Sequence, residues 1–308
     1  MIGIKHVSVE IPPGRLDNLA RQEELDFDEN FLRSKIGAIS VSRLAPEDNT
    51  IDLASRAMGR LLQETGLPAS DVDLLVLVTQ TPCTGGIPHL SAILHHRMGL
   101  RQDCHFFDVA LGCSGWVQGL SIVKGYCASH GLKTAVLVTA DPYSKILDPG
   151  DRNSVLLFGD GAAATLLTER PVFSIGKFAL MSDTQSHEAI RREAGGFFQM
   201  NGRRVMEFGG KLVPASIRQA IAIQDEPGLK IDRYFVHQGS KYIVDQLRRQ
   251  MGASEYEMPY CSTDYGNLVS SSIPAVLKQE WDRTGNRAVV CGFGVGLTSA
   301  ATVLSRLE

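Results

Sequence analysis

The sequence predicts an α/β protein, and two observations carry that prediction. Continuous apolar runs, such as residues 74–79, alternate with segments whose apolar residues recur at helical spacing, such as residues 50–66. The order of these segments also repeats loosely between the two halves of the 308-residue chain. We therefore expect an internal duplication, with one unit over residues 1–168 and a second over residues 169–308.

In the first half, residues 50–66 place apolar side chains on one helical face, and Pro68 interrupts the chain before the next strand. The unbroken apolar run 74–79 is typical of a strand that is covered on both faces. The elements expected in this half are strand 3–11, helix 50–66, strand 74–79, helix 90–99, strand 104–110, helix 115–131, strand 134–139 and strand 154–167.

The second half is expected to follow the same order. The segment Gly-Leu-Lys-Ile-Asp at residues 228–232 resembles Gly-Leu-Pro-Ala-Ser-Asp at residues 66–71, and each precedes or opens a predicted strand. In the same alignment the turn at Asn267 corresponds to the turn at Cys113. A pseudo-twofold axis would bring these two turns face to face. The expected elements are helix 217–223, strand 231–236, helix 241–250, a short strand near Tyr260, a helix from the Asn267 turn to Leu277, strand 288–291 and strand 298–304.

Composition excludes several functional classes. A formal net charge of −3 gives no reason to expect a nucleic-acid or membrane surface, and no apolar run approaches the roughly 18 residues that span a bilayer. The N-terminus lacks the charged-then-apolar order of a signal peptide. Six cysteines without close pairs favour reduced thiols and a cytoplasmic protein. His95 and His96 form a lone pair without further metal ligands, so we expect a surface pair.

Cys113 is the first candidate functional residue. It lies between a predicted strand, 104–110, and a predicted helix that begins near Gly115, in a turn flanked by glycine. A helix N-terminus offers unpaired N–H groups and the positive end of a dipole, which predicts a lowered thiol pKa and a nucleophile. The alternative is a small core residue, because free cysteine is often buried.

His237 and Asn267 are the second and third candidates. His237 follows a predicted strand, where catalytic groups often lie, and Asn267 lies in a turn before a helix. Alone, each has a structural explanation, as a hydrogen-bonded histidine and a turn or cap residue. Two glycine-rich segments are not phosphate sites: residues 158–163 lack a P-loop lysine, and residues 292–296 lack the following helix of a dinucleotide site.

Together these residues carry a resemblance that extends over nearly the whole chain. The sequence resembles the β-ketoacyl-acyl carrier protein synthase III family of the thiolase-like superfamily. The motifs are Gly112–Gly115 (GCSG), Asp148–Arg152 (DPGDR), Phe158–Ala162 (FGDGA), Met200–Gly202 (MNG), His237–Gln238, Gly266–Asn267, Ser270–Pro274 (SSSIP) and Phe293–Gly296 (FGVG).

The resemblance implies a five-layered α-β-α-β-α fold, a homodimer and a catalytic triad of Cys113, His237 and Asn267. Cys113 would take an acyl group from a thioester, and a malonyl thioester would then lose CO₂ and condense with it. The backbone N–H groups of Cys113 and Val295 would stabilise the oxyanion. His237 and Asn267 would donate hydrogen bonds to the enolate. The resemblance implies no metal or redox cofactor, since coenzyme A or acyl carrier protein brings each acyl group on its phosphopantetheine arm. The pathway would be fatty-acid or secondary-metabolite synthesis.

The expected substrate-binding residues depart in part from the family pattern. Phe31 stands where the family has a tryptophan that stacks on the adenine of coenzyme A, and Lys35 replaces a nearby arginine, whereas Arg152 matches. Ile87 falls where a residue of the partner subunit closes the acyl pocket. Phe293, in the glycine-rich motif, is expected beside the substrate. Two further departures lie near the carrier-protein site, where Tyr242 replaces a basic residue, and after His237, where Gly-Ser replaces Ala-Asn.

Two alternative functions remain open at this point. An acyltransferase on the same fold would pass the acyl group from Cys113 to a hydroxyl or an amine, and would not need Asn267. A non-catalytic subunit of a condensing heterodimer would not need the nucleophile, which this chain retains.

Overall fold

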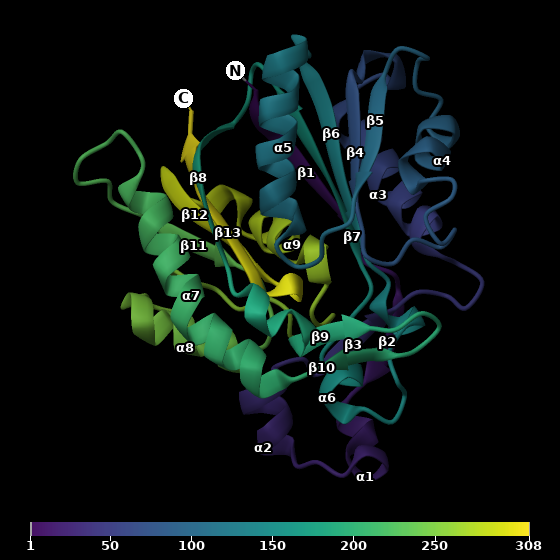
Figure 1. Ribbon diagram of the computed structural model, residues 1–308, viewed down its shortest axis with the longest axis vertical. Coiled ribbons are helices and arrows are strands. Elements are labelled where there is room, and N and C mark those ends of the chain that lie inside the picture. Colours follow the sequence, from purple (N-terminus) through teal and green to yellow (C-terminus); the bar gives the residue numbers. More distant parts are fainter. Residues whose placement is uncertain (1, 308) are drawn as a thin grey trace.

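The computed structural model describes residues 2–307 and has one mixed sheet of nine strands at its centre (Figure 1). The strand order is β11-β12-β13-β8-β1-β7-β6-β4-β5. The strands are β1 (Gly3–Glu10), β4 (Leu74–Val78), β5 (His105–Val109), β6 (Thr134–Ala140), β7 (Ala162–Thr168), β8 (Phe173–Ser182), β11 (Arg233–Val236), β12 (Arg287–Gly294) and β13 (Thr298–Arg306).

The sheet contains two strand groups with the same pattern. In the first group β4 pairs with β6 in parallel, β6 with β7 antiparallel, and β7 with β1 antiparallel. In the second group β11 pairs with β12 in parallel, β12 with β13 antiparallel, and β13 with β8 antiparallel. The groups meet at a single pair, Ile4 and Phe173. This pattern is what an internal duplication would produce, and the division of the chain at residue 168 stays a prediction.

Helices cover and separate the two strand groups (Figure 1). One apolar core joins α3 (Thr50–Thr65) and α4 (Leu90–Arg97) to the first group, and another joins α7 (Gly202–Ala222) and α8 (Lys241–Met251) to the second. Between the groups, the apolar faces of α5 (Gly115–His130) and α9 (Ser272–Gln279) share a third core with strands of both. The predicted α-β-α-β-α layering is confirmed.

Local sequence explains where the main helices begin and end. The Asn49 side chain accepts from the backbone N–H of Ile51 at the start of α3, and the Asp52 side chain accepts from that of Asn49. Gly66 and Gly131 end α3 and α5 in the left-handed conformation that glycine adopts without strain. These signals account for the close agreement between the predicted and observed bounds of both helices.

Three predicted elements differ from the structure. Residues 154–161 are not strand, because Asp151 caps a short helix, α6 (Arg152–Val155), and β7 begins only at Ala162. The segment near Tyr260 is not a strand, since it joins β11 through the bond from Tyr234 N–H to the Glu257 carbonyl (2.7 Å) without forming a ladder. The helix predicted over 217–223 begins instead at Gly202.

The sequence pattern also missed several elements. Strand β8 alternates buried and exposed residues too irregularly to give a clear pattern. The other missed elements are the hairpin strands β2 (Gly14–Asp17) with β3 (Ser40–Arg43), β9 (Ile190–Arg192) with β10 (Phe198–Met200), and the short helices α1 (Gln22–Leu25) and α2 (Glu29–Phe31). Within residues 2–307, no helix is both long enough and apolar enough to cross a membrane.

Candidate active site

Cys113 lies in a tight turn between β5 and α5. The turn is closed by the bond from the Gly115 N–H to the Gly112 carbonyl (2.7 Å). A Cβ on Gly112 would lie 2.3 Å from Oε1 of Gln80, and one on Gly115 would lie 2.5 Å from a methyl group of Val78. A side chain at either position would therefore force a neighbour to move, Val78 most of all, and within this closely packed turn Cys113 is 6% exposed.

A second loop packs directly against the thiol of Cys113. Gly294, at the end of β12, has φ +156°, and a Cβ there would lie 2.8 Å from both Cβ and Sγ of Cys113. The backbone groups of Val295 and of Cys113 itself lie close enough to the sulfur to lower its pKa. Their N–H groups are the two donors expected to stabilise an oxyanion, and the structure places both beside the nucleophile.

The acidity of Cys113 differs from the sequence-based expectation. Burial raises the pKa of the thiol to about 12, and the nearby Asp141 carboxylate raises it further, while the two N–H donors offset only part of the effect. The prediction that the helix N-terminus lowers this pKa is wrong for the ligand-free site, because desolvation outweighs it. The resting nucleophile is a protonated thiol.

His237 follows β11, and its backbone N–H donates to the Cys291 carbonyl (2.8 Å), which continues the parallel pairing with β12. Its ring packs edge-on against Phe293, with 5.3 Å between ring centres. Burial lowers the pKa of His237 to about 3, and the nearby backbone of Val269 offsets only part of this. The imidazole is therefore neutral at physiological pH, which suits a group that donates or accepts one hydrogen bond.

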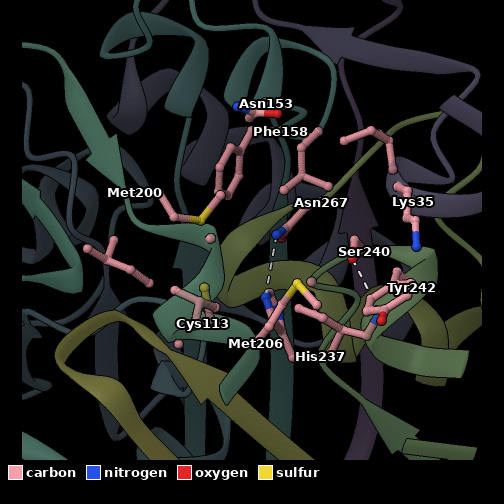
Figure 2. Close-up of a pocket in the computed structure, with 18 of the residues that line it drawn as sticks. Lys35, Cys113, Asn153, Phe158, Met200, Met206, His237, Ser240, Tyr242 and Asn267 are labelled. Carbon is pink, nitrogen blue, oxygen red and sulfur yellow. Dashed lines mark hydrogen bonds between the residues drawn. The ribbon is translucent and has the colours of Figure 1, made fainter. Parts of the chain in front are cut away.

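Asn267 is held by its backbone and by its side-chain oxygen. It forms a bridge with Phe158, and its Oδ1 accepts from the Val269 N–H (2.8 Å) and from the Ser272 hydroxyl (3.2 Å). Val269 has φ +53°, a strained conformation for a branched residue. Because Oδ1 is occupied, Nδ2 points toward Nε2 of His237 at 3.4 Å (Figure 2).

Cys113, His237 and Asn267 all line one cavity of about 580 Å³. Figure 2 shows the three side chains around a common space, with Asn267 directed at His237. Side chains at one end of the cavity are exposed or half-buried, and those near Cys113 are buried, so the cavity runs inward from a surface mouth. The mouth residues are Phe31, Lys35, Asn153, Arg203, Met206 and Tyr242, and the inner residues are Tyr143, Leu157, Phe158, Ile190, Phe198 and Phe293.

The structure separates the expected substrate-binding residues into two sets. Phe31, Lys35 and Phe293 line the cavity. Arg152 lies just outside, with its guanidinium 5.8 Å from the ring centre of Phe31. Ile87 does not line this cavity, and its side chain is 89% exposed on the loop before α4. Its role in closing the cavity of a second subunit stays a prediction.

Sequence reasoning missed the aromatic part of the cavity. The rings of Tyr143, Phe158 and Phe198 pack together with centres 5.1 to 5.3 Å apart, and all three are buried. Phe198 belongs to the missed strand β10, and Tyr143 lies in a connection after β6. Only Phe158 carried a signal, since it belongs to a recognised motif.

Comparison with known families agrees with this arrangement. The family model described as 3-oxoacyl-[acyl-carrier-protein (ACP)] synthase III matches residues 107–184, and the model of its C-terminal domain matches residues 228–306. Cys113 lies in the first match, and His237 and Asn267 lie in the second.

Individual relatives and solved structures agree with the family models. A β-ketoacyl-[acyl-carrier-protein] synthase III of Gloeobacter violaceus is 31% identical over 94% of this chain and 93% of the relative. One from Lactobacillus helveticus is 28% identical over 94% of each. A crystal structure of a 3-oxoacyl-(acyl-carrier-protein) synthase III has a TM-score of 0.90 at 29% identity and covers 99% of both chains. The corresponding enzyme of Pseudomonas aeruginosa PAO1 gives a TM-score of 0.90 at 26% identity, with 100% and 98% covered.

Proposed function

This chain belongs to the 3-oxoacyl-[acyl-carrier-protein] synthase III family of acyl-transferring condensing enzymes, and from that premise we propose the role of each residue in its site. Cys113 carries the acyl group, the N–H groups of Cys113 and Val295 stabilise the oxyanion, and His237 and Asn267 stabilise the enolate. One observation carries the proposal: Cys113 lines the same cavity as His237 and Asn267, and in it Nδ2 of Asn267 lies 3.4 Å from Nε2 of His237.

The first step is acyl transfer to Cys113. Its sulfur attacks the thioester carbonyl carbon, and the carbonyl oxygen takes up negative charge beside the two N–H donors. The carbon–sulfur bond of the donor then breaks, and its thiol leaves with the proton that Cys113 gives up. Because the resting thiol has a pKa of about 12, this proton must move during the attack.

The second step is decarboxylation and condensation. A malonyl thioester loses CO₂, and the electron pair of the broken bond forms an enolate whose oxygen accepts hydrogen bonds from His237 Nε2 and Asn267 Nδ2. The enolate carbon attacks the acyl carbonyl on Cys113, the carbon–sulfur bond to Cys113 breaks, and the sulfur leaves as a thiolate that takes up a proton from solvent. An amide and a neutral imidazole suit this task because both donate without adding a full charge to the cavity.

The orientation of Asn267 is the strongest argument for condensation over simple acyl transfer. Its oxygen is occupied by the Val269 N–H and the Ser272 hydroxyl, so its Nδ2 is directed into the cavity. In the empty site Nδ2 lies 3.4 Å from Nε2 of His237. A substrate oxygen between the two groups accepts from both when the ring proton is on Nε2. Acyl transfer to an alcohol or amine requires no such pair of donors.

The mouth of the cavity supports delivery of both acyl groups on phosphopantetheine thioesters. Lys35 and Arg203 provide positive charge there, and Phe31 and Tyr242 provide aromatic faces. We assign the primer to an acyl-CoA or acyl carrier protein, the extender to malonyl carrier protein, and no metal or redox group to the reaction. We further propose a homodimer, with Ile87 reaching the cavity of the partner, and action in the cytoplasm, where a thiol nucleophile stays reduced.

The experiment is intact-protein mass spectrometry with a panel of acyl thioesters, followed by malonyl carrier protein. We expect an acyl adduct on Cys113 that disappears as CO₂ and a β-ketoacyl product appear. An adduct that survives malonyl carrier protein but passes to an alcohol or an amine would overturn the assigned condensation. Light scattering tests the dimer, and a monomer would contradict the proposed role of Ile87.

A further inference from the structure

Asp141 is a buried carboxylate that the proposed steps do not use. It follows the last residue of β6 and is 0% exposed. A buried carboxylate is costly unless hydrogen bonds satisfy its oxygens, so its partners indicate what it does. Those partners come from two distant parts of the chain, the end of β4 and the segment before α9.

The first side of Asp141 faces the end of β4. Its Oδ1 accepts from the Gln80 N–H (2.8 Å), the Thr79 hydroxyl (3.2 Å) and, at 3.5 Å, the Thr81 hydroxyl. Gln80 is thereby fixed, and its side chain lies where a Cβ on Gly112 would come within 2.3 Å. This side of Asp141 therefore supports the turn that holds Cys113.

The second side of Asp141 faces the segment that carries Asn267. Its Oδ2 accepts from the Ser270 hydroxyl. Ser270 is three residues after Asn267 and directly after the strained Val269, whose N–H holds Oδ1 of Asn267. This side of Asp141 therefore supports the turn that aims Nδ2 of Asn267.

We propose that Asp141 is a positioning residue for the condensation, which holds the Cys113 turn and the Asn267 segment in register through Gln80 and Ser270. The inference rests on the proposed function, because it assigns Cys113 and Asn267 to two steps that share one substrate position. A displacement of about 1 Å between two such groups is enough to lower a rate about 100-fold. We call the contact of Asp141 with Gln80 the Cys113 arm and its contact with Ser270 the Asn267 arm. Because the two arms involve different residues, each can be removed by its own substitution.

The charge of Asp141 supplies a readout that a purely structural residue would not move. Its carboxylate contributes to the raised pKa of Cys113, and burial raises its own pKa to about 6. The titratable groups that face it are the Cys113 thiol, from the turn before α5, and the Tyr143 hydroxyl, from its own connection. Removing the charge without changing the shape should therefore make the thiol more acidic.

Three variants of the Asp141 contact test the proposal, and Asp160→Asn is the matched control. Asp160 is also fully buried, and it holds the N–H groups of Leu44 and Ser144, but it does not contribute to the pKa of Cys113. Asp141→Ala removes both arms, Asp141→Asn keeps the shape without the charge, and Ser270→Ala cuts only the Asn267 arm. Thermal unfolding of each variant shows that it is folded before rates are compared.

Two rates are measured: alkylation of Cys113 by iodoacetamide at pH 8, and condensation of the acyl-enzyme with malonyl carrier protein. We expect Asp141→Asn to raise the alkylation rate about tenfold and Asp160→Asn to leave it unchanged. Ser270→Ala should be acylated at the wild-type rate and should condense about tenfold more slowly. Asp141→Ala should condense about 100-fold more slowly than the wild type, and Asp141→Asn should lie between the two.

The proposal is overturned if folded Asp141→Ala loads and condenses like the wild type, or if Asp141→Asn and Asp160→Asn alkylate at the same rate. If Asp141→Ala does not fold, Asp141→Asn and Ser270→Ala decide, and wild-type condensation by both is the contrary result. Alkylation needs no acyl substrate. A wild-type protein that fails to condense would therefore disprove the proposed function and still leave the Asp141 contact testable.

Discussion

The two strand groups share a pattern but differ in the residues that come directly after equivalent strands. In the first group β4 leads into Thr79 and Gln80, which support other residues, and in the second β11 leads into His237, which lines the cavity. Strand β6 leads into the buried Asp141, whereas β12 ends in Gly294 against the nucleophile. The same arrangement of strands therefore presents a supported nucleophile from one group and hydrogen-bond donors from the other.

The strongest test of this division removes the nucleophile. The comparison assigns covalent chemistry to the first group alone, so Cys113→Ala should abolish the acyl adduct and lower product formation at least about a thousandfold. Intact mass after incubation with acyl thioesters measures the adduct. The exposed Cys83 supplies the control, because Cys83→Ala should load normally. An adduct that persists in Cys113→Ala would contradict the assignment of covalent chemistry to the first strand group.

The next test concerns the contact between the two strand groups at which Gly294 packs against Cys113. Gly294→Ala adds a methyl group 2.8 Å from Cys113 Sγ at a φ of +156°. We expect loading to fall about 100-fold, because the loop that carries the Val295 N–H must move away. Gly59→Ala is the matched control, since Gly59 lies within α3 with nothing within 4 Å of an added Cβ. Rapid-quench loading assays compare the two, and equal rates would show that the close approach is dispensable.

A third test separates loading from condensation. Asn267→Ala removes one enolate donor and leaves both oxyanion donors in place, so loading should stay near wild type. Condensation should fall about 100- to 1000-fold, as for the loss of an oxyanion-hole donor. The ratio of the two single-turnover rates is the measurement. A parallel loss in both steps would mean that Asn267 supports the fold of the site instead of the enolate.

The smallest expected effect is the dependence of stability on pH. The pKa of His237 is lowered to about 3 in the folded chain from an ordinary 6.5. Between these values the unfolded chain binds a proton that the folded chain does not, so His237 lowers stability as pH falls below about 6.5. The slope is at most about 1.4 kcal/mol per pH unit.

Urea unfolding of wild type and His237→Gln between pH 7 and pH 5 measures this effect. Asp141 acts in the opposite sense, because its pKa is raised from 3.8 to about 6 and its folded form binds the extra proton in that window. Both chains keep Asp141, so its effect cancels in the difference between their unfolding free energies. A difference that does not change with pH would mean that the ring is protonated in the folded protein.

The sequence predicted those parts of the molecule that depend on local pattern. Strand β4 is a continuous buried run, and α3 carries both its cap and its terminal glycine, so its bounds agreed closely with the prediction. Helix α7 did not, because Gly209, Gly210 and Pro214 interrupt its pattern while its apolar face packs against β12 and β13.

The site was predictable where its residues belong to motifs and unpredictable where burial decides. Cys113, His237 and Asn267 were named from strand ends, turns and the family resemblance, and they line one cavity. Tyr143 and Phe198 were missed because they reach it from irregular segments. The acidity of Cys113 was misjudged because the desolvation comes from contacts with distant residues, including Gly294, which the local turn does not reveal.

The high pKa of the resting thiol also determines how the protein meets oxidants. Peroxides react with thiolates, so susceptibility follows both deprotonation and exposure. Cys113 is buried and protonated, whereas Cys83 is exposed on the loop before α4. In the single chain we therefore expect oxidants to reach Cys83 before Cys113, whereas the proposed dimer would place the loop of Cys83 and Ile87 against the partner. A nucleophile that forms only during the reaction leaves the resting enzyme with a thiol that reacts slowly with peroxides.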